Sequence, residues 1–266
     1  MRRVAELGNL EGRIALITGA VGGLGSVFSD ALSEKGADLI LVDRDERKLE
    51  DLRVQLTKKW NNKISSYVCD LEIQEQRDQL ISIVGREKQL NVLINNAAYV
   101  GTTNLPGWNV PFKEQSIETW RQAMEVNLTS IFSLCQGFSR LLEVSEGASI
   151  INISSMYGSF GPDWRLYEGT NMSNSAAYSA SKGGLIQLTR WLSTTMAPAV
   201  RVNSISPGGI YRNQNADFVK RYEAKVPLKR MATEDDFRGV ITFLASDLSK
   251  YVTGQNIPVD GGWGVW

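Results

Sequence analysis

The sequence predicts an α/β fold in which a parallel β-sheet carries helices on both faces. Two observations lead to this prediction. Short β-branched or apolar runs recur at wide spacing, and longer segments with helical periodicity lie between them. Strands that alternate with helices imply βαβ units, whose parallel sheet is buried on both sides. No internal repeat or linker interrupts the alternation, so we expect residues 1–266 to form one domain.

Seven runs are the expected strands, and the helices are expected in the segments between them. The strands are expected at 13–18, 38–42, 64–68, 92–95, 149–153, 202–205 and 257–259. The helical segments include 24–35, 74–86, 117–142 and 178–196. In the last of these, Leu185, Leu188 and Leu192 recur at helical spacing and mark an apolar face. The expected architecture is therefore a doubly wound, seven-stranded parallel sheet.

Charge and composition exclude several classes of protein. Lys plus Arg and Asp plus Glu both total 29, and neither sign forms a long block, so we expect no nucleic-acid or anionic-membrane partner. The first nine residues carry charge but no apolar stretch, which argues against a secretory signal. No apolar run approaches the roughly 20 residues of a membrane span. Cys69 and Cys135 lie in apolar stretches and are interpreted as buried hydrophobes, which suits a cytoplasmic protein.

Two stretches break the alternation of strands and helices. Residues 156–177 are rich in glycine and asparagine, and residues 210–231 are polar and irregular. Both follow expected strand ends, and the carboxyl edge of an open α/β sheet is where ligands bind. Long loops in a compact domain are commonly lids or binding loops. We expect a substrate site there; the alternative is that the loops only cover the sheet or contact another subunit.

A glycine-rich turn follows the first expected strand and opens a helix. Glycines let backbone amides approach a pyrophosphate, which then sits on the positive N-terminus of the helix. Because strand, turn and helix occur in the required order, the segment indicates a Rossmann-type nucleotide site. The expected cofactor contacts in the turn are Thr18, Gly19, Gly22, Gly23, Leu24 and Gly25.

The second expected strand ends at Asp43, 18 residues after Gly25. This is close to the spacing of about 20 residues at which an acid binds the ribose hydroxyls. A carboxylate there repels a 2′-phosphate, although the adjacent Arg44 could blunt the repulsion. Gly22 also stands where a phosphate-binding arginine would be expected. NAD is therefore the expected cofactor and NADP the less favoured one; the alternative for Asp43 is a simple turn residue.

The chain contains no histidine, so a different side chain must carry acid–base chemistry. Tyr178 and Lys182 are four residues apart and share a helix face, downstream of Ser155. A nearby cation favours the phenolate over the phenol. The pair is a candidate acid–base couple, and an exposed lysine on an ordinary amphipathic helix is the alternative.

Together, these motifs resemble the short-chain dehydrogenase/reductase superfamily over nearly the whole chain. Cys69-Asp70-Leu71 resembles the segment that contacts adenine, and Asn95-Asn96-Ala97-Ala98 resembles the family's Asn-Asn-Ala-Gly strand end. The remaining motifs are Asn127 in a helix, Ser155 after a strand, the pair Tyr178 and Lys182, the turn Pro207-Gly208, and Val259-Asp260-Gly261-Gly262. The resemblance implies further cofactor contacts at Arg44, Asp70, Leu71, Asn96, Ala97, Ala98, Tyr178, Lys182, Pro207, Gly208 and Ile210.

The resemblance also implies roles for four catalytic residues. Ser155 would donate a hydrogen bond to the substrate oxygen. Tyr178 would be the general base in oxidation and the general acid in reduction. Lys182 would lower the pKa of Tyr178 and hold the nicotinamide ribose, and Asn127 would position a water that links Lys182 to solvent. The bound nicotinamide would carry the hydride.

Two departures from the family pattern stand out. Ser155 and Tyr178 are 23 residues apart, whereas about a dozen is usual in the superfamily, so residues 156–177 are an insertion that must loop out and return. Arg212 stands where many relatives have a threonine that contacts the cofactor amide. Ile210 could still contact the cofactor through its backbone.

The insertion resembles the flagellin modification protein A branch, which is associated with bacterial surface sugars such as nonulosonic acids. This implies a sugar or sugar-phosphate substrate. Tyr157, Trp164 and Tyr167 are candidate stacking surfaces for it. The polar candidates are Asp163, Arg165, Glu168, Arg212 and Lys225; the alternative is that these charges are solvated or paired.

Other functions stay open at this point. One is a reductase of 3-oxoacyl or steroid carbonyls, and another is a protein that binds NAD without turnover. A sugar-nucleotide epimerase normally needs a larger C-terminal domain, and a zinc enzyme normally needs histidine or clustered cysteine, so no metal is expected. Relatives are commonly dimers or tetramers. We therefore expect a homodimer or homotetramer with the Trp-rich end, 262–266, at a subunit interface or near a neighbouring site.

Overall fold

The computed structural model describes residues 1–101 and 103–266 and contains one sheet of seven parallel strands. The strands are β1 Ile14–Thr18, β2 Asp38–Asp43, β3 Ile64–Val68, β4 Val92–Asn95, β5 Ser149–Ile153, β6 Arg201–Pro207 and β7 Asn256–Val259. Their order is β3-β2-β1-β4-β5-β6-β7. The chain therefore reverses direction across the sheet between β1 and β4, the kind of switch point at which α/β sheets bind ligands. The predicted doubly wound parallel sheet is confirmed.

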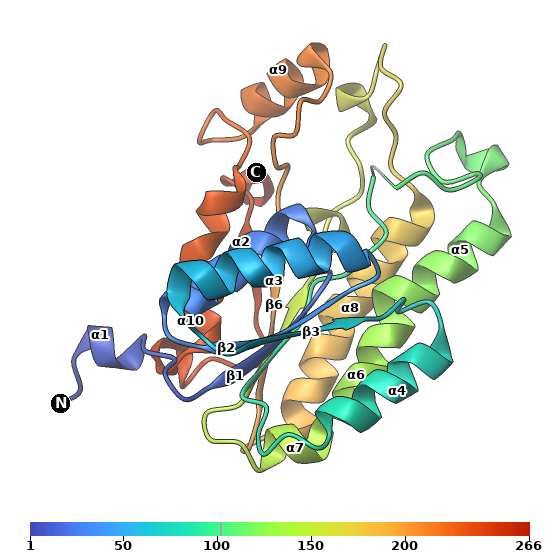
Figure 1. The fold of residues 1–266 in the computed structure, drawn as a ribbon. Helices are drawn as coiled ribbons and strands as arrows, with labels where there is room; N and C mark the ends of the chain where they lie inside the picture. Colours follow the sequence, from blue (N-terminus) through green and yellow to red (C-terminus); the bar gives the residue numbers. More distant parts are fainter. Residues whose placement is uncertain (102) are drawn as a thin grey trace.

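Helices cover both faces of the sheet (Figure 1). Their bounds are α1 Val4–Leu7, α2 Gly23–Glu34, α3 Glu46–Trp60, α4 Gln74–Val84, α5 Ile117–Met124, α6 Ser130–Gly137, α7 Ser139–Glu143, α8 Ala176–Thr195, α9 Ala216–Lys225 and α10 Arg238–Ala245. Apolar residues of α2, α3 and α10 pack on one face, and those of α4, α6, α7 and α8 pack on the other. Leu185 and Leu192 of α8 are buried there, with Leu188 packed beside them.

The segment expected as one helix over 117–142 is broken into three helices. A π-helical turn, Glu125–Thr129, separates α5 from α6, and α7 begins after Phe138. Extra residues in such turns occur frequently at functional sites. Here the turn carries Asn127, whose side chain is fully buried.

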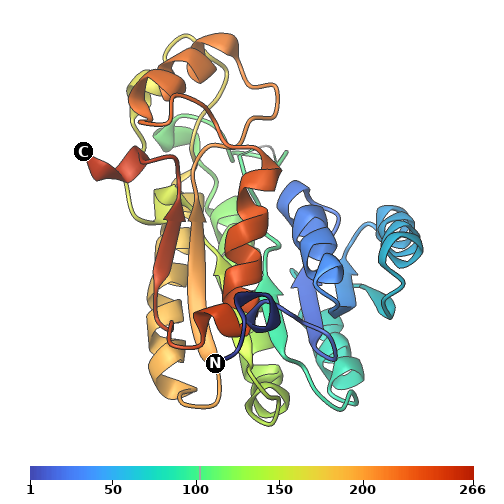
Figure 2. The same ribbon diagram turned by 90° about the vertical axis from the view of Figure 1, so that its left-hand side faces the viewer.

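The two irregular stretches rise above the carboxyl edge of the sheet (Figures 1 and 2). The insertion, 156–177, contains only short 3-10 turns at Met156–Gly158 and Trp164–Leu166 before α8 begins. The expectation of an irregular 210–231 is wrong, because α9 lies within it. The helix buries only Phe218 and Tyr222, and Val219 is the one other large apolar residue in it, so its apolar period is short.

The C-terminal end packs against its own chain. Trp263 is buried and stacks on Tyr222 of α9, with ring centroids 4.9 Å apart. Val265 and Trp266 are exposed. Trp263 therefore belongs to the core beneath α9 rather than to an outward-facing patch, and only the last residues are free to contact another subunit. The two cysteines are buried and unpaired, as expected.

Helices of the described residues are too short or too polar to cross a membrane.

A buried polar chain fixes β4, β5 and α8 relative to one another. The Asn95 side chain on β4 donates to Asn152 Oδ1 on β5 at 2.8 Å, and Asn152 Nδ2 donates to Thr189 Oγ1 on α8 at 2.9 Å. All three residues are almost fully buried. Because unpaired polar groups in a core are costly, this chain sets the position of α8 on the sheet.

Replacing Asn152 should therefore destabilise the fold strongly. In Asn152→Ala, Asn95 and Thr189 lose a buried partner and a cavity opens, so we expect the free energy of unfolding to fall by about 2–4 kcal/mol. Urea denaturation measures the change. The matched control is Asn104→Ala at an exposed position, for which we expect a change below about 0.5 kcal/mol. Equal effects in the two variants would contradict the proposed role of the chain.

Candidate active site

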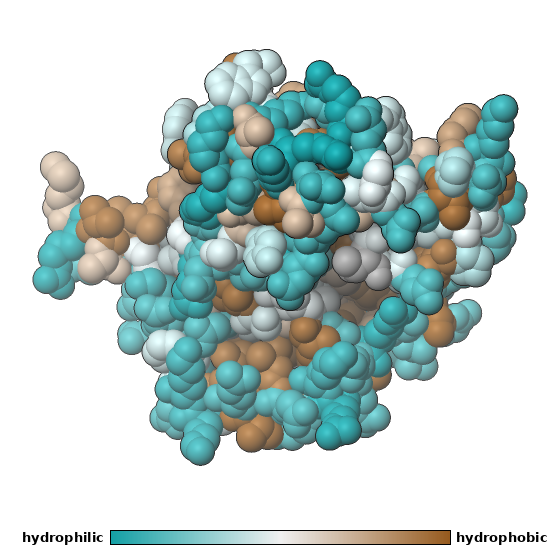
Figure 3. Space-filling view, turned by 90° about the horizontal axis from the view of Figure 1, so that it is seen from above, coloured by the Kyte–Doolittle hydropathy of each residue, from teal (hydrophilic) through white to brown (hydrophobic). Residues whose placement is uncertain are grey.

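A cavity of about 1090 Å³ opens at the carboxyl edge of the sheet. The glycine turn, the ends of the central strands, the insertion, residues 207–215 and α9 all contribute to its wall. Seen from above this edge, the surface is largely hydrophilic, with small apolar patches between the polar side chains (Figure 3). Most of the predicted motifs line the cavity, from Gly19 to Ile210, but Asn127 and the C-terminal motif 259–262 do not.

The glycine turn is shaped so that side chains do not fit. Gly19 has a φ of +63°, and a Cβ there would lie 2.8 Å from Ala97 Cα. A Cβ on Gly25 would lie 2.1 Å from the Gly19 carbonyl oxygen, so the helix start packs directly on the turn. Gly22, Gly23 and Leu24 line the cavity at the N-terminus of α2.

Thr18 and Asn96 join this turn to the end of β4. Thr18 Oγ1 accepts hydrogen bonds from the backbone N–H groups of Asn96 and Ala97, and the Asn96 side chain donates to the carbonyls of Thr18 and Gly19. Thr18 and Gly25 do not line the cavity themselves. Both hold the turn in shape, whereas Asn96, Ala97 and Ala98 line the wall.

Asp43 is fixed at the end of β2 with its carboxylate at the cavity wall. Its two oxygens accept hydrogen bonds from the backbone N–H groups of Val21 and Asp45, each at 3.2 Å. Arg44 lies 4.0 Å from Asp70 and 5.7 Å from the centre of the Tyr99 ring. Asp70 and Leu71 complete this end of the cavity.

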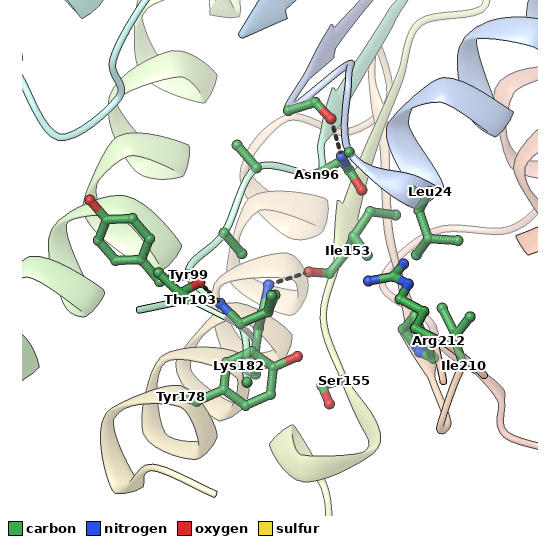
Figure 4. Close-up of a pocket in the computed structure, with 18 of the residues that line it drawn as sticks. Leu24, Asn96, Tyr99, Thr103, Ile153, Ser155, Tyr178, Lys182, Ile210 and Arg212 are labelled. Atoms are coloured by element: carbon green, nitrogen blue, oxygen red, sulfur yellow. Dashed lines mark hydrogen bonds between the residues drawn. The ribbon is translucent and has the colours of Figure 1, made fainter. Parts of the chain in front are cut away.

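Ser155, Tyr178 and Lys182 meet on the opposite wall (Figure 4). Ser155 follows β5, and Tyr178 and Lys182 lie in the first two turns of α8, whose start is capped by the Ser175 hydroxyl. Lys182 is 2% exposed; its Nζ donates to the Ile153 carbonyl at 2.7 Å and lies 5.9 Å from the centre of the Tyr178 ring. The tyrosine hydroxyl points toward Ser155 (Figure 4).

Asn127 lies behind this group and not on the cavity wall. Its Oδ1 accepts from the Tyr99 N–H at 2.7 Å, and its Nδ2 donates to the Tyr99 carbonyl and to Ser181 Oγ. The side chain thus ties the loop after β4 to α8. The water relay expected of Asn127 stays a prediction.

Comparisons with known proteins identify the family of the chain. The family model described as Enoyl-(Acyl carrier protein) reductase matches residues 19–264. The post-translational flagellin modification protein A of Campylobacter coli is 30% identical over 259 residues, which cover 96% of this chain and 100% of that protein. The D-arabinitol 2-dehydrogenase (ribulose-forming) of Candida tropicalis is 33% identical, with 97% and 94% covered. The chain belongs to the short-chain dehydrogenase/reductase superfamily.

Solved structures of this superfamily have the same fold. NAD+-bound xylitol dehydrogenase has a TM-score of 0.82 and 28% identity, with 95% of this chain and 99% of that chain covered. A gluconate 5-dehydrogenase from Burkholderia cenocepacia in complex with NADP and tartrate has a TM-score of 0.87 and 26% identity, with 99% and 100% covered. As a member of the superfamily, the protein is an oxidoreductase that uses a nicotinamide cofactor.

The residues present fit such a cofactor. The turn at the N-terminus of α2 is built of glycines, so no side chain of Gly22 or Gly23 stands between its backbone and the cavity. At one end of the cavity the fixed carboxylate of Asp43 is a hydrogen-bond acceptor for ribose hydroxyls. Tyr178 and Lys182 lie on the opposite wall of the cavity.

The insertion adds aromatic and amide groups to the superfamily site. Tyr157 and Tyr167 line the cavity, and their hydroxyls lie 2.5 Å apart. Five asparagines also line it and were not foreseen as site residues: Asn109, Asn171, Asn174, Asn213 and Asn215. For all but Asn109 the signal was the asparagine content of the irregular stretches, which alone does not say where the side chains point.

The charged residues expected at the substrate do not line the cavity, apart from Arg212. Asp163 is paired with Arg165 and Lys225, each at 2.7 Å, and these cations hold the pKa of its carboxyl well below the usual range. Trp164 is 55% exposed. The alternative of paired or solvated charges is therefore the one observed for these residues.

Burial has the largest effect on the pKa values of Tyr178 and Lys182. It lowers the pKa of Lys182 from 10.5 to about 7, because a charged ammonium is poorly solvated there. Burial also raises the pKa of Tyr178, while the hydrogen bond with Ser155 and the charge of Arg212 act in the opposite direction. Burial thus favours the neutral amine of Lys182 and the neutral phenol of Tyr178.

The lowered pKa of Lys182 predicts a pH-dependent stability. Between about pH 7 and 10.5 the unfolded chain binds a proton at Lys182 that the folded protein does not, so the free energy of unfolding rises with pH. We expect this rise to be missing in Lys182→Met. Urea denaturation of both proteins across this range measures the difference, with Lys220→Met on the exposed side of α9 as the control for loss of a lysine. Parallel curves for the wild type and Lys182→Met would contradict the prediction.

Proposed function

We propose that the protein is an NAD(H)-dependent oxidoreductase that interconverts a secondary alcohol and a ketone on an uncharged sugar or polyol. The observation that carries the proposal is the meeting of Ser155, Tyr178 and Lys182 on a cavity wall that faces amides and aromatic rings. The proposed catalytic residues are those three and Asn127.

The four residues divide the chemistry among them. Ser155 donates a hydrogen bond to the substrate oxygen and stabilises the charge that develops there. Tyr178 takes the hydroxyl proton in oxidation and returns it in reduction. A protonated Lys182 would favour the phenolate form of Tyr178, and Asn127 positions the loop after β4 against α8. A bound nicotinamide supplies or accepts the hydride.

The preference for NAD rests on Asp43. Its carboxylate is held by two backbone N–H groups at the cavity wall, so it accepts the ribose hydroxyls and repels a 2′-phosphate. Arg44, which could attract that phosphate, lies beside Asp70 and Tyr99. Relatives include both NAD- and NADP-bound structures, so the side chain at this position carries the assignment.

The substrate class rests on the lining of the cavity. Four cations line it: Arg44 and Lys48 next to the acids Asp43, Asp45 and Asp70, Lys182 behind the tyrosine, and Arg212 paired with Glu234. The part lined by the insertion and α9 combines asparagine amides and tyrosine hydroxyls with the apolar side chains of Met156, Met172 and Phe218. The amides and hydroxyls suit the hydroxyl groups of a sugar, and the apolar side chains and rings suit its faces. Such a wall favours a neutral sugar or polyol over a sugar phosphate.

Names of the relatives support a hydroxylated substrate. The relatives include D-arabinitol 2-dehydrogenases, xylitol dehydrogenase and gluconate 5-dehydrogenases. The similarity to the flagellin modification protein of Campylobacter coli supports our proposal of a place in bacterial surface-glycan synthesis. The cytoplasmic location and a homodimeric or homotetrameric state remain predictions, as does the assignment of residues 1–266 to one domain.

A 3-oxoacyl reductase is the second candidate. It is favoured by the 31% identity to the 3-oxoacyl-[acyl-carrier-protein] reductase FabG of Thermotoga maritima and by the description of the family model. An acyl chain would leave the asparagine amides of this part of the cavity without hydrogen-bond partners, which argues against it. A protein that binds NAD without turnover is disfavoured because Ser155, Tyr178 and Lys182 are all in place.

A substrate panel tests the proposed function. We expect NADH to form from NAD with polyols or free sugars, and not with sugar phosphates, steroid alcohols or 3-hydroxyacyl thioesters. Tyr178→Phe should lower turnover at least about 100-fold by removing the acid–base group, while NADH binding is kept. Activity confined to acyl thioesters would favour the second candidate. NADH binding with no activity on any class would favour the non-catalytic one.

The cofactor assignment predicts the effect of Asp43→Ala. Loss of hydrogen bonds to a charged acceptor should weaken NADH binding by about 10- to 100-fold and reduce the discrimination against NADPH. Titration calorimetry with both cofactors measures this. Asp51→Ala on the exposed face of α3 is the control. An unchanged ratio of NADH to NADPH affinity in Asp43→Ala would show that the preference lies elsewhere.

A further inference from the structure

The Arg212 guanidinium lies directly above the glycine turn. Its Nη2 is 2.6 Å, and its Cζ 3.1 Å, from the position that a Cβ would take on Gly23. Gly23 is the first residue of α2, so the cation covers the positive end of a helix, an arrangement that needs glycine at position 23. Figure 4 shows the guanidinium below Leu24 and directed toward the wall that carries Ser155 and Tyr178.

This position is built by the surrounding chain. The Arg212 N–H donates to Gln214 Oε1 at 2.7 Å, and Gln214 Nε2 donates to the Ile210 carbonyl at 2.7 Å. The side chain is oriented by Glu234, whose Oε1 accepts from Arg212 Nε at 3.0 Å. In the part of the chain that the structure describes, neither terminal NH₂ group of Arg212 donates to an acceptor. The fork is thus held in place with donors left for a ligand.

The other cations of the cavity lie away from the turn or are engaged. Lys48 pairs with Asp45 at 2.8 Å, and Arg44 lies beside Asp70. Lys182 is buried and donates to the Ile153 carbonyl. Arg212 is therefore the lining cation that is placed to meet an anion on the glycine turn.

We propose that Arg212 binds the pyrophosphate of the dinucleotide cofactor, with Glu234 as the residue that positions its guanidinium. The inference rests on the proposed use of a nicotinamide dinucleotide. Its pyrophosphate carries two negative charges and sits at the N-terminus of the helix after the turn. A guanidinium binds phosphate oxygens through two parallel hydrogen bonds. Arg212 thereby replaces the amide contact expected of a threonine with a contact to phosphate.

Binding of NADH and of ADP-ribose tests the proposal. ADP-ribose contains the pyrophosphate but lacks the nicotinamide. Titration calorimetry on the whole protein would compare the wild type with Arg212→Met and Arg212→Lys. We expect Arg212→Met to weaken both ligands by the same factor, about 10- to 100-fold, and Arg212→Lys to recover part of the loss because it keeps the charge but not the fork. Arg165→Met, at an exposed arginine that is also paired with an acid, should change neither affinity.

Each other outcome has a distinct meaning. Weaker NADH binding with unchanged ADP-ribose binding would overturn the proposal and assign Arg212 to the nicotinamide amide. Unchanged binding of both ligands would overturn it and leave Arg212 to the substrate. If the wild-type protein binds neither NADH nor ADP-ribose, the proposed function itself fails. Far-ultraviolet circular dichroism of the variants separates these results from a loss of folding.

Discussion

The burial of one ammonium group constrains the geometry around it. Lys182 Nζ donates to the carbonyl of Ile153, and the Lys182 carbonyl accepts from Ser154 Oγ. Both the side chain and the backbone of Lys182 therefore join α8 to the end of β5. Gly158 packs directly against α8, where a Cβ would lie only 2.8 Å from the Lys182 backbone. These contacts place Ser155 and Tyr178 opposite each other and fix where the insertion must start. The same burial keeps the cation poorly solvated, which is the origin of its titration near neutral pH.

Charged residues line one part of the cavity and neutral residues another, which suits the proposed binding of a cofactor and of a substrate. Asp43, Arg44, Asp45, Lys48 and Asp70 gather at one end, where a fixed acid can select between ribose and its phosphate. Toward the insertion the lining changes to amides, phenol groups and apolar side chains such as Met172 and Phe218. Under the proposed function these neutral groups bind the substrate. Selectivity for the cofactor and selectivity for the substrate can therefore change independently.

The sequence predicted those parts of the structure that depend on neighbouring residues. Strand, glycine turn and helix are local signals, and so is the spacing of Tyr178 and Lys182 on α8. The break of the helical segment at 125–129 and the helix α9 were not predicted. Few apolar residues mark them in the sequence, and packing in the folded chain determines both. The ion pairs were not predicted either, because their partners are far apart in the sequence. Asp163 and Lys225 are 62 positions apart, and Arg212 and Glu234 are 22 apart. Only the folded chain shows which charges are satisfied and which face the cavity.

The contacts of the insertion with α9 determine which segments must be exchanged together in a chimera of two relatives. Lys225 of α9 pairs with Asp163 and lies 4.2 Å from the centre of the Trp263 ring, while Arg221 donates to the Leu166 carbonyl. Three segments that are distant in the chain thus form one small core around Tyr222. A chimera that received residues 156–177 alone would expose the apolar underside of the loop. Exchange of substrate range between relatives therefore requires the insertion, the helix and the C-terminal tryptophan to be moved as one module.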